Sequence, residues 1–148
     1  MARKARAAFA VAVLVALFPA CACASQLPGL LTQIGSGSTF RVRPAQIIYT
    51  GDGSGILGGF TGKGPLHHFG ALKWSLWGQS QAVGSGAVWL DDCEPNCAQG
   101  TFHPFVVKVH AFEQNAGHFT HLTLRYVYEG KEIIDRRHLF KLSSGYVW

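Results

Sequence analysis

Hydrophobic and polar residues alternate along much of the chain after residue 39, which is the period of a β-strand with one buried face. Glycine-rich stretches and short turn sequences, including turns expected at 115–117 and 129–131, separate the alternating segments, and none of the segments shows a sustained helical repeat. The expected strands are 40–50, 71–78, 79–90, 105–111, 122–128 and 132–142. This pattern predicts an all-β domain, built as a single β-sandwich or a partly closed small barrel.

One face of these expected strands repeats large apolar side chains, and it defines the predicted core: Phe40, Val42, Trp74, Val107, Val109, Leu122, Leu124 and Tyr126. Trp77 follows Trp74 by three residues, so regular alternation places it on the polar face beside Lys73. There it would be a ligand-binding residue that stacks on a sugar or packs against a protein partner. The alternative is that Trp77 covers a loop or enters the core through a bulge at Ser75-Leu76.

The first 24 residues have the three parts of a secretory signal. Three cations precede an apolar run at 7–20, and small residues follow it. The apolar run is shorter than the roughly 20 residues that span a bilayer. We therefore predict cleavage between Ala24 and Ser25 and a secreted, extracellular protein. The sequence before Cys21 also resembles a bacterial lipobox, so the alternative is a membrane-anchored lipoprotein with lipidated Cys21.

Removal of residues 1–24 leaves a chain of single-domain length, in which 25–39 is a predicted flexible leader and 40–148 the predicted β domain. The full chain has 13 Lys and Arg against 8 Asp and Glu, a formal net charge of +5. Three of these cations lie in the signal, so the mature chain carries +2. This weak charge gives little attraction for nucleic acid, and we expect no nucleic-acid partner.

Cys93 and Cys97 form the most specific local motif. Pro95-Asn96 lies between them and favours a tight turn, so we predict a structural disulfide in an oxidising compartment. A zinc site needs further ligands, and the predicted mature chain has no second cysteine pair. A redox pair normally has two intervening residues at a helix N-terminus. We therefore expect no metal ion and no cofactor.

Two other patterns point to ligands or chemistry less directly. The segment 53–58 matches G-x-G-x-x-G, but the glycines and proline after it cannot begin the helix that a dinucleotide site requires, which predicts a glycine loop over 51–64.

His110 and His121 lie on outward strand faces. A small secreted hydrolase would pair one of them with a loop carboxylate, and we keep this as the alternative function. No nucleophile–base spacing is recognisable, so no catalytic residue is assigned.

Several segments resemble small secreted or lipid-anchored proteins of actinobacterial type. The most specific are a Trp-x-x-Trp at 74–77 and a Cys-x-Pro-x-Cys-Ala-x-Gly run at 93–100; the segments 40–48, 51–55, 82–86 and 120–126 add to them. The resemblance implies export, a disulfide and a β fold, without an assigned activity. We therefore expect a non-catalytic cell-envelope or extracellular domain that binds a cell-wall glycan or an envelope protein.

Overall fold

The computed structural model describes residues 26–33, 37–59 and 70–148, and these form an all-β domain, as the alternation predicts. The strands are β1 (Leu30–Gln33), β2 (Thr39–Arg41), β3 (Gln46–Ile48), β4 (Gly55–Gly58), β5 (Lys73–Trp77), β6 (Gln81–Asp91), β7 (Phe102–Asn115), β8 (His118–Tyr128), β9 (Lys131–His138), β10 (Phe140–Leu142) and β11 (Gly145–Val147). Within the described ranges, no helix has the length and apolar character needed to cross a membrane. The predicted signal, with Cys21, Ala24 and Ser25, lies outside the described residues.

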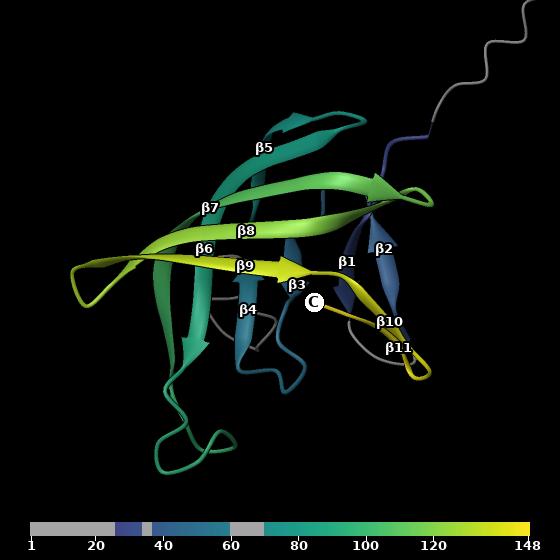
Figure 1. Ribbon diagram of the computed structural model, residues 1–148. Helices are drawn as coiled ribbons and strands as arrows, with labels where there is room; N and C mark the ends of the chain where they lie inside the picture. Colours follow the sequence, from purple (N-terminus) through teal and green to yellow (C-terminus); the bar gives the residue numbers. More distant parts are fainter. Residues whose placement is uncertain (1–25, 34–36, 60–69) are drawn as a thin grey trace, which may run out of the picture.

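Seven strands form one antiparallel sheet in the order β3-β4-β6-β7-β8-β9, with β5 also paired to β6. The long strand β6 pairs with β5 along 82–85 and with β4 along 88–90, on the same side. In Figure 1, β7, β8 and β9 cross the front of the molecule, whereas β3, β4 and β6 run steeply behind them. The sheet therefore bends over its own inner face without closing into a barrel. The β1–β2 and β10–β11 hairpins form two small separate sheets.

Two tight turns connect the front strands. Ala116-Gly117 joins β7 to β8, and Glu129-Gly130 joins β8 to β9. All four residues have positive φ, between 50° and 78°. Two-residue hairpin turns with left-handed backbone at both positions match the twist of the flanking strands. These turns were expected from the sequence, and they fix the register in which Ala111 faces Leu122 and Leu122 faces Arg137.

The inner face of the bent sheet holds the core. Of the predicted core residues, Val107, Val109, Leu122 and Leu124 are buried, and Trp74 and Tyr126 are half-buried against them. The buried cluster consists of Leu30, Ile47, Tyr49, Leu57, Leu72, Trp77, Ala82, Val88, Val107, Val109, Ala111, Phe119, Leu122 and Leu124. Phe40 is half-buried. Val42 is 44% exposed, so its prediction as a core residue is wrong. The reason is that the expected strand 40–50 is interrupted by a turn, in which Arg43 has a φ of 51° and Pro44 cannot donate a backbone hydrogen bond.

Part of the predicted leader belongs to the domain. Leu30 and Leu31 are completely buried, and β1 pairs with β2. The Gly29 amide donates to the Gly117 carbonyl (2.9 Å), and the Phe119 amide donates to the Gly29 carbonyl (3.0 Å). Burial of two successive leucines is not an alternating pattern, which is why periodicity does not reveal this strand.

The predicted glycine loop at 51–64 contains a strand. β4 lies between β3 and β6, so the G-x-G-x-x-G match is a turn followed by an extended segment and not the start of a helix. Gly58 has a φ of 87° and lies against the Ala45 carbonyl, where a β-carbon would collide. Glycine is required there by the close approach of two backbones. Residues 60–69 lie outside the described ranges.

The predicted disulfide is present between Cys93 and Cys97, with an Sγ–Sγ distance of 2.05 Å. It closes the exposed connection between β6 and β7. The carboxylate of Asp91 accepts the Cys93 amide (2.9 Å), and that of Asp92 accepts the amides of Glu94 (3.1 Å) and Thr101 (2.9 Å). The loop is therefore held by its own hydrogen bonds as well as by the covalent link.

Candidate functional site on the outer face of the sheet

Trp77 does not form an exposed platform, and its prediction as a ligand-binding residue is wrong. The pairing of β5 with β6 shifts register between Trp74 and Leu76, so a bulge turns Trp77 to the inner face. Its side chain is 6% exposed and its Nε1 donates to the Pro28 carbonyl (3.0 Å). The rings of Trp74 and Trp77 meet edge to face, with centroids 4.6 Å apart. The bulge at Ser75-Leu76, which was the alternative expectation, therefore explains the burial.

The outer face of β7, β8 and β9 carries the polar side chains that alternate with the core. Cross-strand pairing brings together residues that are far apart in sequence. One row consists of Gln81, Phe112, His121 and His138; the next contains Val83, His110, Thr123 and Arg136; the third contains Lys73, Ser85, Lys108, Arg125 and Ile134. The exposed face therefore combines aromatic rings at one end with cations at the other.

The aromatic rings form a continuous stack, which we call the ring row. Its members are His110, Phe112, His121 and His138, with successive centroids 5.0, 5.1 and 4.3 Å apart and interplanar angles of 29°, 23° and 18°. Phe140 closes one end at 4.9 Å from His138, tilted by 60°. Because these rings face one another, they present their edges to solvent. The edge of an aromatic ring is its electropositive side, and the imidazole nitrogens also lie there.

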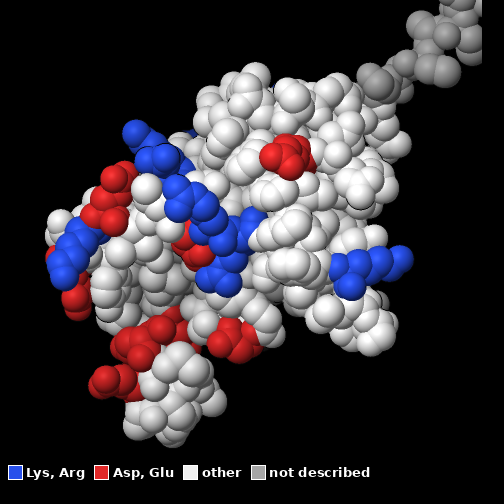
Figure 2. Space-filling model, in the orientation of Figure 1, with Lys and Arg blue, Asp and Glu red and all other residues white. Residues whose placement is uncertain are grey.

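Beside the ring row lies a group of exposed cations, which we call the cation band: Lys73, Lys108, Arg125 and Arg136. Lys108 and Arg125 are direct cross-strand partners. Among the described residues, the only carboxylate within 4.0 Å of any of them is that of Glu132, 3.9 Å from Arg125. Figure 2 shows Lys and Arg gathered in a band across the front strands. Like charges in directly opposed positions destabilise a sheet, so stability alone does not account for the arrangement.

An open depression of about 460 Å³ joins the two groups. It is lined by Lys108, Arg125 and Arg136 from the cation band and by His110 and Phe112 from the ring row, together with Gln81, Val83, Val109 and Thr123. A second depression, of about 530 Å³, shares Gln81, His110 and Phe112 with the first and is bordered by Glu113. The first depression offers three cations together with the Thr123 hydroxyl and the Gln81 amide. These groups suit a ligand that carries both anionic groups and hydroxyls.

The structure places His110 and His121 on the outer face, as predicted, but not in a catalytic arrangement. His121 Nδ1 lies 3.1 Å from the Thr120 hydroxyl and 3.5 Å from the Glu113 carboxylate. A catalytic triad needs the hydroxyl on one ring nitrogen and the carboxylate on the other. Here a single nitrogen faces both, so His121 cannot relay a proton between them.

A second histidine–carboxylate pair, His103 with Asp92, lies beside the disulfide loop. The His103 Nε2 is 3.0 Å from Asp92 Oδ2, and both side chains are exposed. Hydrogen bonds from the Thr101 amide, from His103 and from the Glu94 amide lower the pKa of Asp92 to about 2. The described residues place no hydroxyl or thiol within hydrogen-bond distance of the His103 ring. This pair therefore supports the loop and gives no support to a hydrolase.

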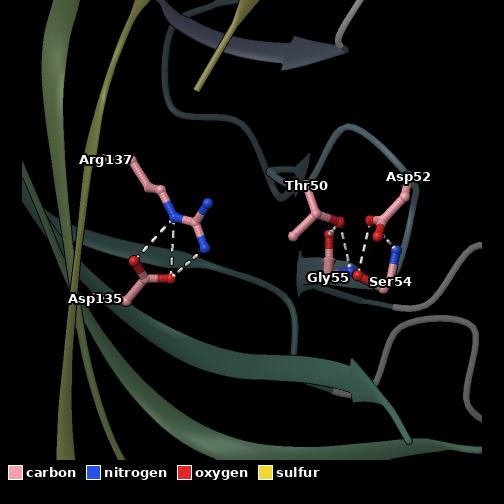
Figure 3. A network of polar contacts seen from close by, with 6 residues as sticks. All are labelled: Thr50, Asp52, Ser54, Gly55, Asp135 and Arg137. Carbon is pink, nitrogen blue, oxygen red and sulfur yellow. Dashed lines mark hydrogen bonds and ion pairs between the residues drawn. The ribbon is translucent and has the colours of Figure 1, made fainter. Parts of the chain in front are cut away.

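The least exposed ion pair lies on the opposite, inner face of β9. Arg137 donates from Nε to both Asp135 oxygens (2.8 and 3.1 Å) and from Nη2 to one of them (2.8 Å). Its guanidinium lies 5.3 Å from the centre of the Tyr49 ring. Figure 3 shows Arg137 pointing toward the turn that holds Asp52, whose carboxylate accepts the amide (3.0 Å) and hydroxyl (2.7 Å) of Ser54. These bonds lower the Asp52 pKa to about 2.

Both carboxylates are thus satisfied by their immediate neighbours, and we interpret this network as structural. β9 is one of the edge strands of the sheet. Inward-pointing charges on an edge strand oppose its pairing with a strand of another molecule.

Replacing Arg137 with alanine should lower the free energy of unfolding by about 1–3 kcal/mol, because Asp135 loses its partner while partly buried. Arg136 is the matched control, since it is the neighbouring residue on the outer face and is exposed. Its replacement with alanine should change stability by less than about 0.5 kcal/mol. Urea denaturation of the two variants measures the difference. Equal effects would contradict a structural role specific to Arg137.

Sequence reasoning identified two members of the ring row and missed the rest. Phe112 and His138 become neighbours of His121 only through the pairing of β7, β8 and β9. The cation band also combines residues from four strands. One signal could have found part of this site. If the two strands are folded back on each other at the expected turn at 115–117, the outward positions from Lys108 to Phe112 come to lie opposite those from His121 to Arg125.

No protein-family model matches the sequence, and neither a curated protein nor a solved structure is significantly similar to it. The resemblance to small secreted proteins of actinobacterial type therefore stays a prediction.

Proposed function

We propose that the protein is an exported, non-catalytic binding domain of the cell envelope or extracellular space, and that its outer face binds an acidic polysaccharide. The observation that carries the proposal is the depression that Lys108, Arg125 and Arg136 line together with Thr123, next to the ring row. Cations bind the carboxylate, phosphate or sulfate groups of such a polymer through charge-assisted hydrogen bonds. Thr123 and Gln81 provide hydrogen-bonding groups for its hydroxyls.

The stacking of the rings favours a glycan over a single-stranded nucleic acid. Proteins that bind single strands expose aromatic faces on which the bases stack. In the ring row, the faces of Phe112 and His121 are turned toward each other and toward their neighbours. An extended polymer that binds through cations and ring edges fits this surface better than one that needs exposed ring faces.

Export is part of the same proposal. The disulfide is compatible with an extracellular location, and the predicted signal would direct the chain there. We propose secretion after cleavage between Ala24 and Ser25, with lipidation of Cys21 as the alternative. The intact mass of the exported protein distinguishes a chain that begins at Ser25 from one that carries a lipid on Cys21.

Binding of the purified protein to four immobilised polymers tests the proposed ligand: polygalacturonate, neutral dextran, polyglutamate and single-stranded DNA. We expect polygalacturonate to bind most tightly and its affinity to fall steeply as salt is raised from about 0.05 M to about 0.5 M, because exposed charges are then screened. Dextran should not bind. Tighter binding of DNA or polyglutamate would identify a different class of partner and contradict the proposal, as would equal binding of dextran.

A further inference from the structure

We propose that binding at this face is linked to proton uptake, so that the ring row makes the domain bind its acidic ligand more tightly in mildly acidic surroundings. This inference rests on the proposed function and adds the regulation of the same site. Three histidines lie in one contiguous stack beside the cation band. Histidine is the side chain whose charge ordinarily changes between pH 5 and pH 8.

The hydrogen bonds of two histidines determine which ring nitrogen carries the proton in the neutral form. The Thr120 hydroxyl donates to the Glu113 carbonyl (3.2 Å), so its oxygen accepts from His121 Nδ1–H (3.1 Å). His110 Nε2 lies 3.1 Å from the Gln81 side-chain oxygen, which only accepts, so this nitrogen is the donor. In the neutral rings, His121 Nε2 and His110 Nδ1 are left with lone pairs.

Those lone pairs decide how the neutral rings respond to an anionic ligand. An unprotonated nitrogen repels a carboxylate oxygen, whereas a protonated nitrogen donates a charge-assisted hydrogen bond to it. Protonation of His121 or His110 would therefore convert an unfavourable contact with an acidic sugar into a favourable one. The ligand should select the protonated form of the ring row, and by linkage binding should take up protons.

The charges around the ring row bear on how a bound ligand changes the protonation of its histidines. His121 faces the Glu113 carboxylate of β7 at 3.5 Å and the second imidazole, His138 of β9, at a centroid distance of 4.3 Å. The neighbouring rows contribute the cations Arg136 of β9, Lys108 of β7 and Arg125 of β8, and the neutral Gln81 and Phe140 complete the surroundings. A polyanion on this face neutralises the surrounding cations, and it pairs with a protonated ring nitrogen but not with an unprotonated one.

Isothermal titration of the protein with polygalacturonate, in two buffers of equal pH but different ionisation enthalpy, measures the protons taken up. At about pH 6.5 we expect uptake of roughly one proton per site, and affinity about tenfold higher at pH 5.5 than at pH 8. The triple variant His110→Gln/His121→Gln/His138→Gln, which removes every histidine of the ring row, should lose most of the uptake and bind equally at both pH values. His138→Gln alone removes an exposed ring, and we expect it to lower the uptake.

The matched control is His103→Gln, which removes an exposed histidine beside the disulfide loop and should leave proton uptake unchanged. Binding of wild-type protein without proton uptake would overturn this inference and leave the proposed function intact. Full proton uptake in both His138→Gln and the triple variant would overturn it in the same way. Absence of binding at both pH values would overturn the proposed function itself, and this inference with it.

Discussion

Replacing Trp77 with alanine should lower the free energy of unfolding by about 3–5 kcal/mol, the usual cost of truncating a large aromatic residue in a core. The indole is almost completely buried and packs edge to face against Trp74 and Phe119. Its Nε1 also holds the Pro28 carbonyl, which ties the segment before β1 to the sheet. Truncation therefore removes apolar contacts and leaves a buried carbonyl without its donor. Denaturant unfolding monitored by circular dichroism measures the loss.

Leu76 is the matched control for Trp77. It is the adjacent residue on β5, but its side chain faces outward and is 45% exposed. Leu76→Ala should change the free energy of unfolding by less than about 0.5 kcal/mol, because much of the side chain is already in water. Similar small losses for both variants would show that Trp77 is not part of the core.

Replacing Lys108, Arg125 and Arg136 together with glutamine should lower the affinity for polygalacturonate by about 100-fold or more. Each hydrogen bond to a charged group contributes roughly 1.5–3 kcal/mol, and each 1.4 kcal/mol is a factor of ten in affinity. All three side chains are exposed, and relief of the repulsion between Lys108 and Arg125 should keep the folded state at least as stable. Affinity at low salt and the thermal midpoint are the two measurements.

The control removes the same number of charges elsewhere on the surface. Arg41, Lys131 and Lys141 are exposed and lie on β2, β9 and β10, outside the depression. Their replacement with glutamine should reduce binding only slightly, through the smaller net charge. If both triple variants lose affinity equally, the attraction is a property of the whole molecule, and the depression is not the site.

Alternation predicted the front of the sheet because its strands obey the rule on which the prediction rests. Val107, Val109, Leu122 and Leu124 are buried at every second position, and the turns after β7 and β8 carry the expected glycines. The rule failed where backbone geometry departs from a regular strand. The bulge in β5 reversed the expected orientation of Trp77.

The candidate site was less predictable than the fold, since it depends on pairings between distant segments. His121 and His138 stack because β8 and β9 align them, and Arg136 joins the depression for the same reason. Glu113 shows a local limit of another kind. Its φ of 49° interrupts the regular backbone of β7. On the paired strand β8, Phe119 is completely buried, whereas His121, two residues later, faces outward, so the two do not share a face as regular alternation would require. Spacing along one segment cannot reveal such a change.

The two tight turns at 116–117 and 129–130 have a consequence for how this surface can evolve. Side chains alternate between the two faces of a strand, so a shift of one residue in register moves every outward side chain inward. If the turn keeps two residues, one residue inserted at Glu129-Gly130 would turn Arg136 to the inner face and Arg137 to the outer face, while every residue of the site remained in the sequence. A change in the length of a turn outside the binding face can thus abolish or create that face. Relatives that share the amino acids of the binding face need not share its chemistry.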